Sequence, residues 1–256
     1  MSLKAHFTDN TSMIRILYLI YQWVIFVPLL ILSTTWCTLT IIIGSTLGNN
    51  KFWGYYPGVI WGRFVCVAAL LRIKVNRKVV LDKKQSYIFV ANHQGAFDIF
   101  LVYGYLGHNF KWLMKQSLKK MPLVGLASSK AGHVFVDQSS RKGIVETMKN
   151  TRDTLKEGMS TVVFPEGHRT PDGNMAEFKK GAFQTALSLK LPIVPMTIDG
   201  AYKVLPIHSW RMSPSAISLT FHEPIETANL TSDDLPELMK KVHSIIESSL
   251  LSKGNS

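Results

Sequence analysis

The segment YIFVANHQGAFDIFLVYGYL, residues 87–106, contains the clearest indication of the fold of this chain. It begins with a short apolar run, Tyr87 to Ala91, of the kind that forms a buried strand, and it ends with a second apolar run. The polar heptapeptide NHQGAFD, Asn92 to Asp98, lies between them. Because ligands of α/β sheets bind where loops leave the strand ends, this junction predicts a functional site.

The junction contains a histidine and an aspartate five residues apart, His93 and Asp98. Imidazole changes protonation near neutral pH, so His93 is a candidate general base for a hydroxyl group. A carboxylate on the other ring nitrogen fixes the tautomer and stabilises the imidazolium that forms. The same spacing occurs by chance in many loops, so the interpretation depends on the other motifs.

Beyond residue 72 the chain alternates short apolar runs with amphipathic segments. Such alternation predicts an α/β fold, with a mixed, largely parallel sheet flanked by helices. We expect strands at 73–81, 87–91, 133–136, 160–164, 193–198 and 217–221, and helices at 96–106, 141–157, 181–189 and 235–246.

The N-terminal region predicts a membrane-embedded helical segment. Residues 16–50 contain no charged side chain, which exceeds the ~20 residues that cross a bilayer core. Pro28 is a candidate kink, and Gly44 and Gly48 are candidate ends of the helix. A second apolar stretch, 52–71, is interrupted only by Arg63. We therefore expect membrane-associated helices over 1–71 and a catalytic domain over 72–256.

Two arrangements of the N-terminal region fit its sequence. The first is a true span followed by an interfacial helix, and the second is a helical hairpin that dips into one leaflet. Arg63 favours an interfacial second helix, because a charge in the middle of a bilayer is costly.

The formal net charge of +12 requires an acidic partner. Lys and Arg are spread over 72–190, and no nucleic-acid-binding motif or zinc-ligand spacing accompanies them, so we expect neither nucleic acid nor metal nor cofactor. An anionic membrane surface or a phosphate-bearing substrate is the simpler partner. Cys37 and Cys66 lie in apolar stretches and are interpreted as small hydrophobic residues.

A second polar loop, FPEGHRT, follows the expected strand at 160–164 and presents Glu166 and Arg169 at a bend. Arginine holds phosphate through a planar bidentate fork. Ten residues on, Lys179 and Lys180 precede an expected helix start at Gly181, where anions are favoured. Taken singly, a surface ion pair and a solvated pair of lysines explain these residues equally well.

Together the loops resemble the glycerolipid acyltransferase family, in particular its 1-acyl-sn-glycerol-3-phosphate (lysophosphatidic acid) acyltransferases. The resemblance covers roughly residues 85–200 and consists of four blocks in the family's order. They are Asn92, His93 and Asp98 of the first block, GHVFVDQ at 132–138, FPEGHRT at 164–170 and LPIVPM at 191–196.

The resemblance implies acyl transfer from a thioester, acyl-CoA or acyl-carrier protein (acyl-ACP), to the sn-2 hydroxyl of 1-acyl-glycerol-3-phosphate, which forms phosphatidic acid. His93 would deprotonate the hydroxyl, Asp98 would orient His93, and no acyl-enzyme is implied. Gly95 and the backbone N–H groups at the start of the following helix are candidates for stabilising the oxyanion. The expected substrate-binding residues are Lys115, Glu166, Gly167, Arg169, Lys179 and Lys180, with Arg169 on the phosphate. The expected location is the inner or cytoplasmic membrane, with the catalytic domain on the cytoplasmic side.

Two residues depart from the family pattern. Gln138 replaces an arginine, which is expected either to weaken one phosphate contact or to shift it to nearby Arg141, and His168 replaces a threonine. Because of these two replacements, other lysophospholipids, or an aminoacyl lipid, remain alternative acceptors. A Ser-His-Asp hydrolase is disfavoured because no Gly-x-Ser-x-Gly motif occurs. A non-catalytic basic protein of the membrane surface remains the alternative of another class.

Overall fold

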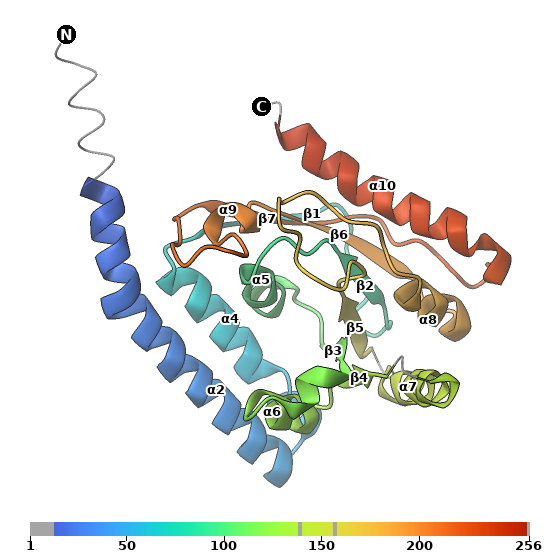
Figure 1. Cartoon of the computed structure of the whole chain (residues 1–256). Coiled ribbons are helices and arrows are strands. Elements are labelled where there is room, and N and C mark those ends of the chain that lie inside the picture. Colours follow the sequence, from blue (N-terminus) through green and yellow to red (C-terminus); the bar gives the residue numbers. More distant parts are fainter. Residues whose placement is uncertain (1–12, 138–139, 156–157, 255–256) are drawn as a thin grey trace.

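A seven-stranded sheet forms the centre of the molecule in the computed structural model, which describes residues 13–137, 140–155 and 158–254 (Figure 1). Its order is β1-β7-β6-β2-β5-β3-β4. The strands from β6 to β4 are parallel, whereas β7 is antiparallel to β6 and parallel to β1. The predicted mixed, largely parallel sheet is confirmed. The strands are β1 (Arg72–Arg77), β2 (Ile88–Ala91), β3 (Phe110–Lys115), β4 (Val134–Val136), β5 (Ser160–Val163), β6 (Ile193–Asp199) and β7 (Ala216–Phe221).

Helices cover both faces of the sheet, because the side chains of the buried strands alternate between them. Phe89 and Ala91 of β2 pack toward α5 and α4, whereas Ile88 and Val90 pack toward α8 and α10. The helical elements are η1 (Gln22–Phe26), α2 (Val27–Leu47), α3 (Asn50–Trp53), α4 (Tyr56–Ala68), α5 (Phe97–Tyr105), η2 (Gln116–Lys120), α6 (Val124–Lys130), α7 (Arg141–Thr154), α8 (Gly181–Leu189), α9 (Ala201–Val204), η3 (Ser232–Asp234) and α10 (Leu235–Gly254).

Most predicted elements are found within a few residues of their expected bounds. The strand expected at 73–81 already ends at Arg77, and the helix expected at 141–157 ends at Thr154, with residues 156–157 outside the described part. Strand β3 was not predicted. Its alternation of Phe110, Trp112 and Met114 is a strand pattern, but Lys111 interrupts the apolar run.

The N-terminal apolar segment is one long helix, Met13–Leu47, that ends at Gly48 as expected. Pro28 does not break it. The preceding turn, η1, is a π-helix, and Pro28 lies in the first turn of α2, where a missing N–H is tolerated. Gly44 lies inside the helix, against Trp53, and does not end it: a Cβ there would lie 2.4 Å from the indole.

This helix and α4 form a hairpin whose inner face joins the core of the domain (Figure 1). Phe26, Tyr55 and Val65 belong to the same buried cluster as Phe89 of the sheet. The Trp61 indole N–H donates to Thr34 Oγ1 at 3.1 Å and holds the two helices together. Because the hairpin shares its core with the sheet, a domain boundary at residue 72 stays a prediction.

A buried lysine ties the hairpin to the sheet. Lys111 of β3 donates from Nζ to Asn50 Oδ1 of α3 at 3.3 Å and to the carbonyl oxygen of Ala131. The Asn50 side chain in turn donates to the Lys130 carbonyl oxygen at 2.7 Å. Burial lowers the pKa of the Lys111 ammonium to about 8, because desolvation disfavours the charged form.

This buried charge makes stability depend on pH. The unfolded chain holds the proton up to pH 10.5 and the folded chain only to about 8, so stability rises as pH increases between these values. We expect Lys111→Met to remove a rise of about 3 kcal/mol. The measurement is the unfolding midpoint from pH 8 to 10.5, with exposed Lys74→Met as the control. A pH-dependent rise in stability of equal size in both variants contradicts the expectation.

Candidate active site

The carboxyl ends of the parallel strands bring the predicted site residues to one edge of the sheet. His93 follows β2, the loop at 164–170 follows β5, and Lys115 ends β3. Strand β2 pairs in parallel with β5, and β5 pairs in parallel with β3, so these ends are adjacent. The side chain of Asn92 extends the pairing of β2 with β6, because it donates to the Ile198 carbonyl and accepts from the Ile198 N–H, each at 2.8 Å.

The predicted His–Asp pair is formed. His93 Nδ1 lies 2.7 Å from Asp98 Oδ2, and Asp98 is fully buried, whereas the His93 side chain retains 15% of its exposure. Asp98 lies in the first turn of α5, where the helix dipole favours a carboxylate. Since Nδ1 faces Asp98, Nε2 is the ring nitrogen left for a substrate proton.

The expectation that Gly95 steadies an oxyanion is corrected by the geometry. The backbone N–H groups of Gln94 and Gly95 both donate to Asp98 Oδ2, at 2.7 and 2.9 Å. They therefore hold the carboxylate at the position that meets the imidazole, and they do not face a reacting carbonyl.

Glu166 is buried and binds backbone. Its Oε1 accepts the His93 N–H at 2.6 Å, and its Oε2 accepts the Ala176 N–H at 2.8 Å. Burial raises the pKa of this carboxyl above its ordinary value, and the two N–H donors oppose the rise. Both oxygens are engaged by the chain, so Glu166 fixes the backbone of His93 to the loop at 171–180.

Phe164 is a site residue that the sequence interpretation did not single out. Its ring is stacked on the His93 imidazole, with centroids 4.1 Å apart and planes inclined by 9°, and its other neighbour is Trp112. Together with Asp98 it determines the orientation of the imidazole. A large aromatic residue directly after a buried strand and before a polar loop is the signal that could have identified it.

The basic residues of the site lie around the loop after β5. A Cβ on Gly167 would lie 2.7 Å from Lys179 Nζ, so the lysine side chain passes against this glycine, whose φ of +76° disfavours other residues. Within the described part of the chain, no carboxylate forms an ion pair with Arg169. Lys180 is exposed and directly precedes α8 at Gly181, as expected.

Of the two residues that depart from the family pattern, the structure describes only His168. Gln138 lies outside the described residues, and so does the Arg141 side chain. His168 is exposed on the loop after β5, and its ring contacts only the adjacent Arg169 carbonyl oxygen, 3.3 Å from Nδ1, among the residues described.

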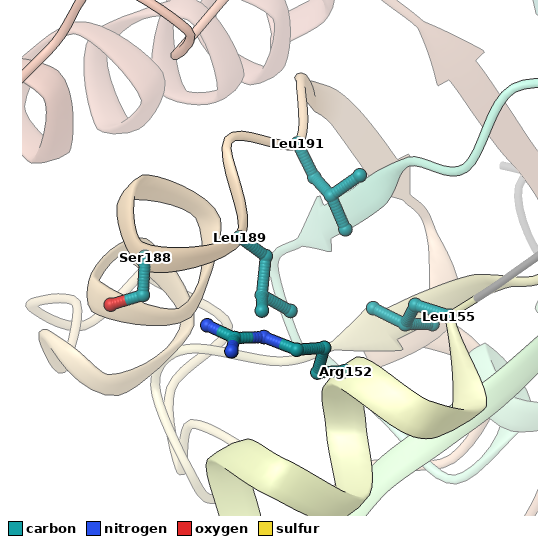
Figure 2. A pocket seen from close by; sticks show the side chains of 5 residues that line it. All are labelled: Arg152, Leu155, Ser188, Leu189 and Leu191. Carbon is teal, nitrogen blue, oxygen red and sulfur yellow. The ribbon is translucent and has the colours of Figure 1, made fainter.

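A surface cavity of about 320 Å³ lies at the opposite edge of the sheet (Figure 2). Arg152 and Leu155 at the end of α7, together with Ser188, Leu189 and Leu191, line it. Leu155 precedes β5 and Leu191 precedes β6, so the cavity faces the amino ends of the strands. It is therefore separate from the His93 site.

A family model described as Acyltransferase matches residues 72–199, which are 128 of the 256 residues. The chain belongs to this acyltransferase family. The matched region contains His93, Asp98 and the loop after β5.

Relatives and a solved structure agree with this assignment. A 1-acyl-sn-glycerol-3-phosphate acyltransferase of Cocos nucifera is 30% identical over 62% of this chain, and the match spans 52% of that relative. One of Limnanthes alba is 28% identical over 87% of this chain and 79% of the relative. The crystal structure of the 1-acyl-sn-glycerophosphate (LPA) acyltransferase of Thermotoga maritima has a TM-score of 0.75 and 23% identity, covering 96% and 98% of the two chains. At that identity it shows that the fold is shared.

Proposed function

We propose that this acyltransferase moves a fatty acyl group from a thioester, acyl-CoA or acyl-ACP, to the sn-2 hydroxyl of 1-acyl-glycerol-3-phosphate, which yields phosphatidic acid. The observation that carries the proposal is the His93–Asp98 pair at 2.7 Å, with Nε2 left for a substrate. The names of the plant relatives support the choice of acceptor.

The reaction needs a base and a properly placed acceptor. His93 Nε2 takes the hydroxyl proton while the oxygen attacks the thioester carbonyl, and Asp98 stabilises the imidazolium. Collapse of the tetrahedral intermediate breaks the C–S bond, and the imidazolium returns the proton to the leaving thiolate. Both cysteines are buried in α2 and α4, which supports direct attack without an acyl-enzyme.

The acceptor phosphate is the proposed partner of the basic residues at this edge. Arg169 binds it through the guanidinium fork, and Lys115, Lys179 and Lys180 add positive charge. Gly167 keeps the backbone open beside Lys179. Glu166 belongs to the same site, but its two hydrogen bonds to backbone support a positioning role in place of the expected contact with the acceptor.

Arg169→Ala is expected to raise the KM for 1-acyl-glycerol-3-phosphate about 10- to 100-fold with a smaller effect on kcat, because a charge-assisted phosphate contact is lost. Steady-state kinetics with monoacylglycerol, which lacks the phosphate, should show little change in KM. Arg152→Ala, at the opposite edge of the sheet, is the matched control. An unchanged KM for the phosphorylated acceptor in Arg169→Ala contradicts the assignment.

The enzyme is proposed to act at an anionic membrane surface, on the cytoplasmic side of the inner or cytoplasmic membrane. The helix Met13–Leu47 has 35 residues, about 52 Å at 1.5 Å per residue, and most of its surface is exposed and apolar. It contacts the domain from Tyr18, which donates to the Ala69 carbonyl, to Gly44 beside Trp53. Contact along this length favours a hairpin in one leaflet over a span.

A different lysophospholipid is the second candidate acceptor, and the observation that favours it is exposed His168 beside Arg169. One assay separates the candidates: purified protein, a panel of lysolipids and both thioester donors, with release of free thiol as the readout. Fastest transfer to 1-acyl-glycerol-3-phosphate supports the proposal. Preference for another headgroup changes the acceptor, and no thiol release with any pair contradicts enzymatic function.

A further inference from the structure

The connection between β3 and α6 has an exposed surface that is both apolar and basic. Four large apolar side chains within six residues of this connection have relative exposures between 45% and 58%. Two exposed lysines directly precede them. These six residues are called the α6 patch: Lys119, Lys120, Met121, Leu123, Val124 and Leu126. Exposure of this many large apolar side chains in one short segment is typical of a contact surface.

The backbone holds the patch in this arrangement. Leu123 has φ 60° and ψ −53°, and the Val124 N–H donates to the Pro122 carbonyl oxygen at 2.6 Å, which closes a tight γ-turn. A non-glycine residue in this conformation is strained, and strain of this kind is concentrated at functional positions. Gly125 allows η2 and α6 to touch, because a Cβ there would lie 2.2 Å from the Lys119 carbonyl oxygen. Leu123 is therefore exposed by a rigid turn.

The patch borders the apolar hairpin. Ala127 of α6 and Ala131, directly after this helix, pack against Cys37 and Ile41 of α2, and Figure 1 shows α6 beside the carboxyl-terminal half of α2. The outward side of α2 is apolar and exposed along its length. The patch extends this apolar surface from the hairpin onto the catalytic domain.

The segment that carries the patch has only positive charges, and carboxylates of a neighbouring segment, Asp137, Glu146 and Asp153, share a cavity with Lys119. Residues 99–136 contain no aspartate or glutamate, whereas Lys115, Lys119, Lys120 and Lys130 fall in this range. Apolar side chains flanked by lysines match an anionic lipid surface, in which the side chains enter the acyl region and the ammonium groups meet phosphates.

We propose that the α6 patch is a second membrane-contact element that inserts into an anionic bilayer beside the hairpin. The inference rests on the proposed membrane association of the hairpin. Lys115, at the end of β3, directly precedes η2, so this contact holds the basic edge of the active site at the level of the lipid headgroups. The acceptor's phosphate then lies at the depth of His93.

A polarity-sensitive fluorophore tests the patch without relying on activity. Leu123→Cys carries the label in a Cys37→Ala, Cys66→Ala background of the full chain, reconstituted in phosphatidylcholine vesicles with or without phosphatidylglycerol. Leu32→Cys, exposed on α2, reports insertion of the hairpin. Val80→Cys, an exposed apolar position far along the chain from both, is the aqueous control.

We expect the label at 123 to be blue-shifted and shielded from aqueous iodide in anionic vesicles, as at 32, while the label at 80 stays accessible. Lys119→Gln with Lys120→Gln should shift half-maximal insertion to higher phosphatidylglycerol content, by about fivefold in lipid affinity per lysine. A label at 123 that stays accessible while the label at 32 is shielded overturns the patch and leaves the hairpin intact. If shielding of the label at 123 increases with the amount of protein per vesicle at constant lipid composition, the patch contacts a second copy of the chain instead of lipid. This result also overturns the proposal.

Discussion

His93→Ala is expected to lower kcat about a hundredfold to ten-thousandfold, because the proposed general base for the acceptor's hydroxyl is lost. The KM for the acceptor should change little, since Nε2 of His93 acts on the hydroxyl and not on the phosphate. Asp98→Asn should lower kcat to a similar extent. The amide oxygen of the substituted side chain can still accept the N–H groups of Gln94 and Gly95, but the charge that stabilises the imidazolium is gone.

Thiol release with saturating 1-acyl-glycerol-3-phosphate measures both effects. His208→Ala, an exposed histidine outside the site, is the control and should retain the wild-type rate. Both site variants should keep the wild-type unfolding midpoint to within a few degrees and remain bound to vesicles. Near-normal transfer by His93→Ala is incompatible with the proposed mechanism, whatever the behaviour of Asp98→Asn.

The contact between His93 and Asp98 was predictable because the residues that form it are close together in the sequence. His93 and Asp98 are separated by one tight loop, and the buried strand before them and the helix after them are visible as apolar runs. The same locality explains why α8 was predicted with its observed bounds, Gly181–Leu189. Strand β3 was missed because a lysine at position 111 is compatible with a buried strand only when distant residues, Asn50 and Ala131, accept its hydrogen bonds.

The hydrogen bonds of Glu166 were not predictable for a related reason. In the sequence, a carboxylate at a bend beside an arginine indicates a surface group that meets the substrate. In the structure, the side chain points inward, and its partners are backbone groups at His93, 73 residues away, and at Ala176. The direction of a side chain at a turn depends on which distant backbone donors are left unpaired, and a pattern of residue types does not contain this information.

Glu166→Gln is expected to lower kcat about a hundredfold while leaving the KM for the acceptor nearly unchanged. A glutamine offers one oxygen to two N–H donors, so its NH₂ group faces either the His93 or the Ala176 N–H. The His93 backbone then moves, and a displacement of the base by a fraction of an ångström reduces proton transfer. Loss of a substrate contact would instead raise KM, so the two parameters separate the roles. Glu177→Gln, exposed on the same loop, is the control.

Glu166→Gln is also expected to change how the stability of the protein depends on pH, which gives a second, independent test. Because burial raises the pKa of Glu166, the folded state binds its proton more tightly than the unfolded chain does. The carboxylate therefore lowers stability as pH rises from 4.5 through the raised value, and glutamine has no such dependence. The unfolding midpoint of Glu166→Gln relative to wild type should increase over this range, while its kcat stays low at every pH. A rise in KM with unchanged kcat would mean that Glu166 meets the acceptor, and a pH-independent difference in midpoint would mean that folding leaves the pKa of Glu166 unchanged.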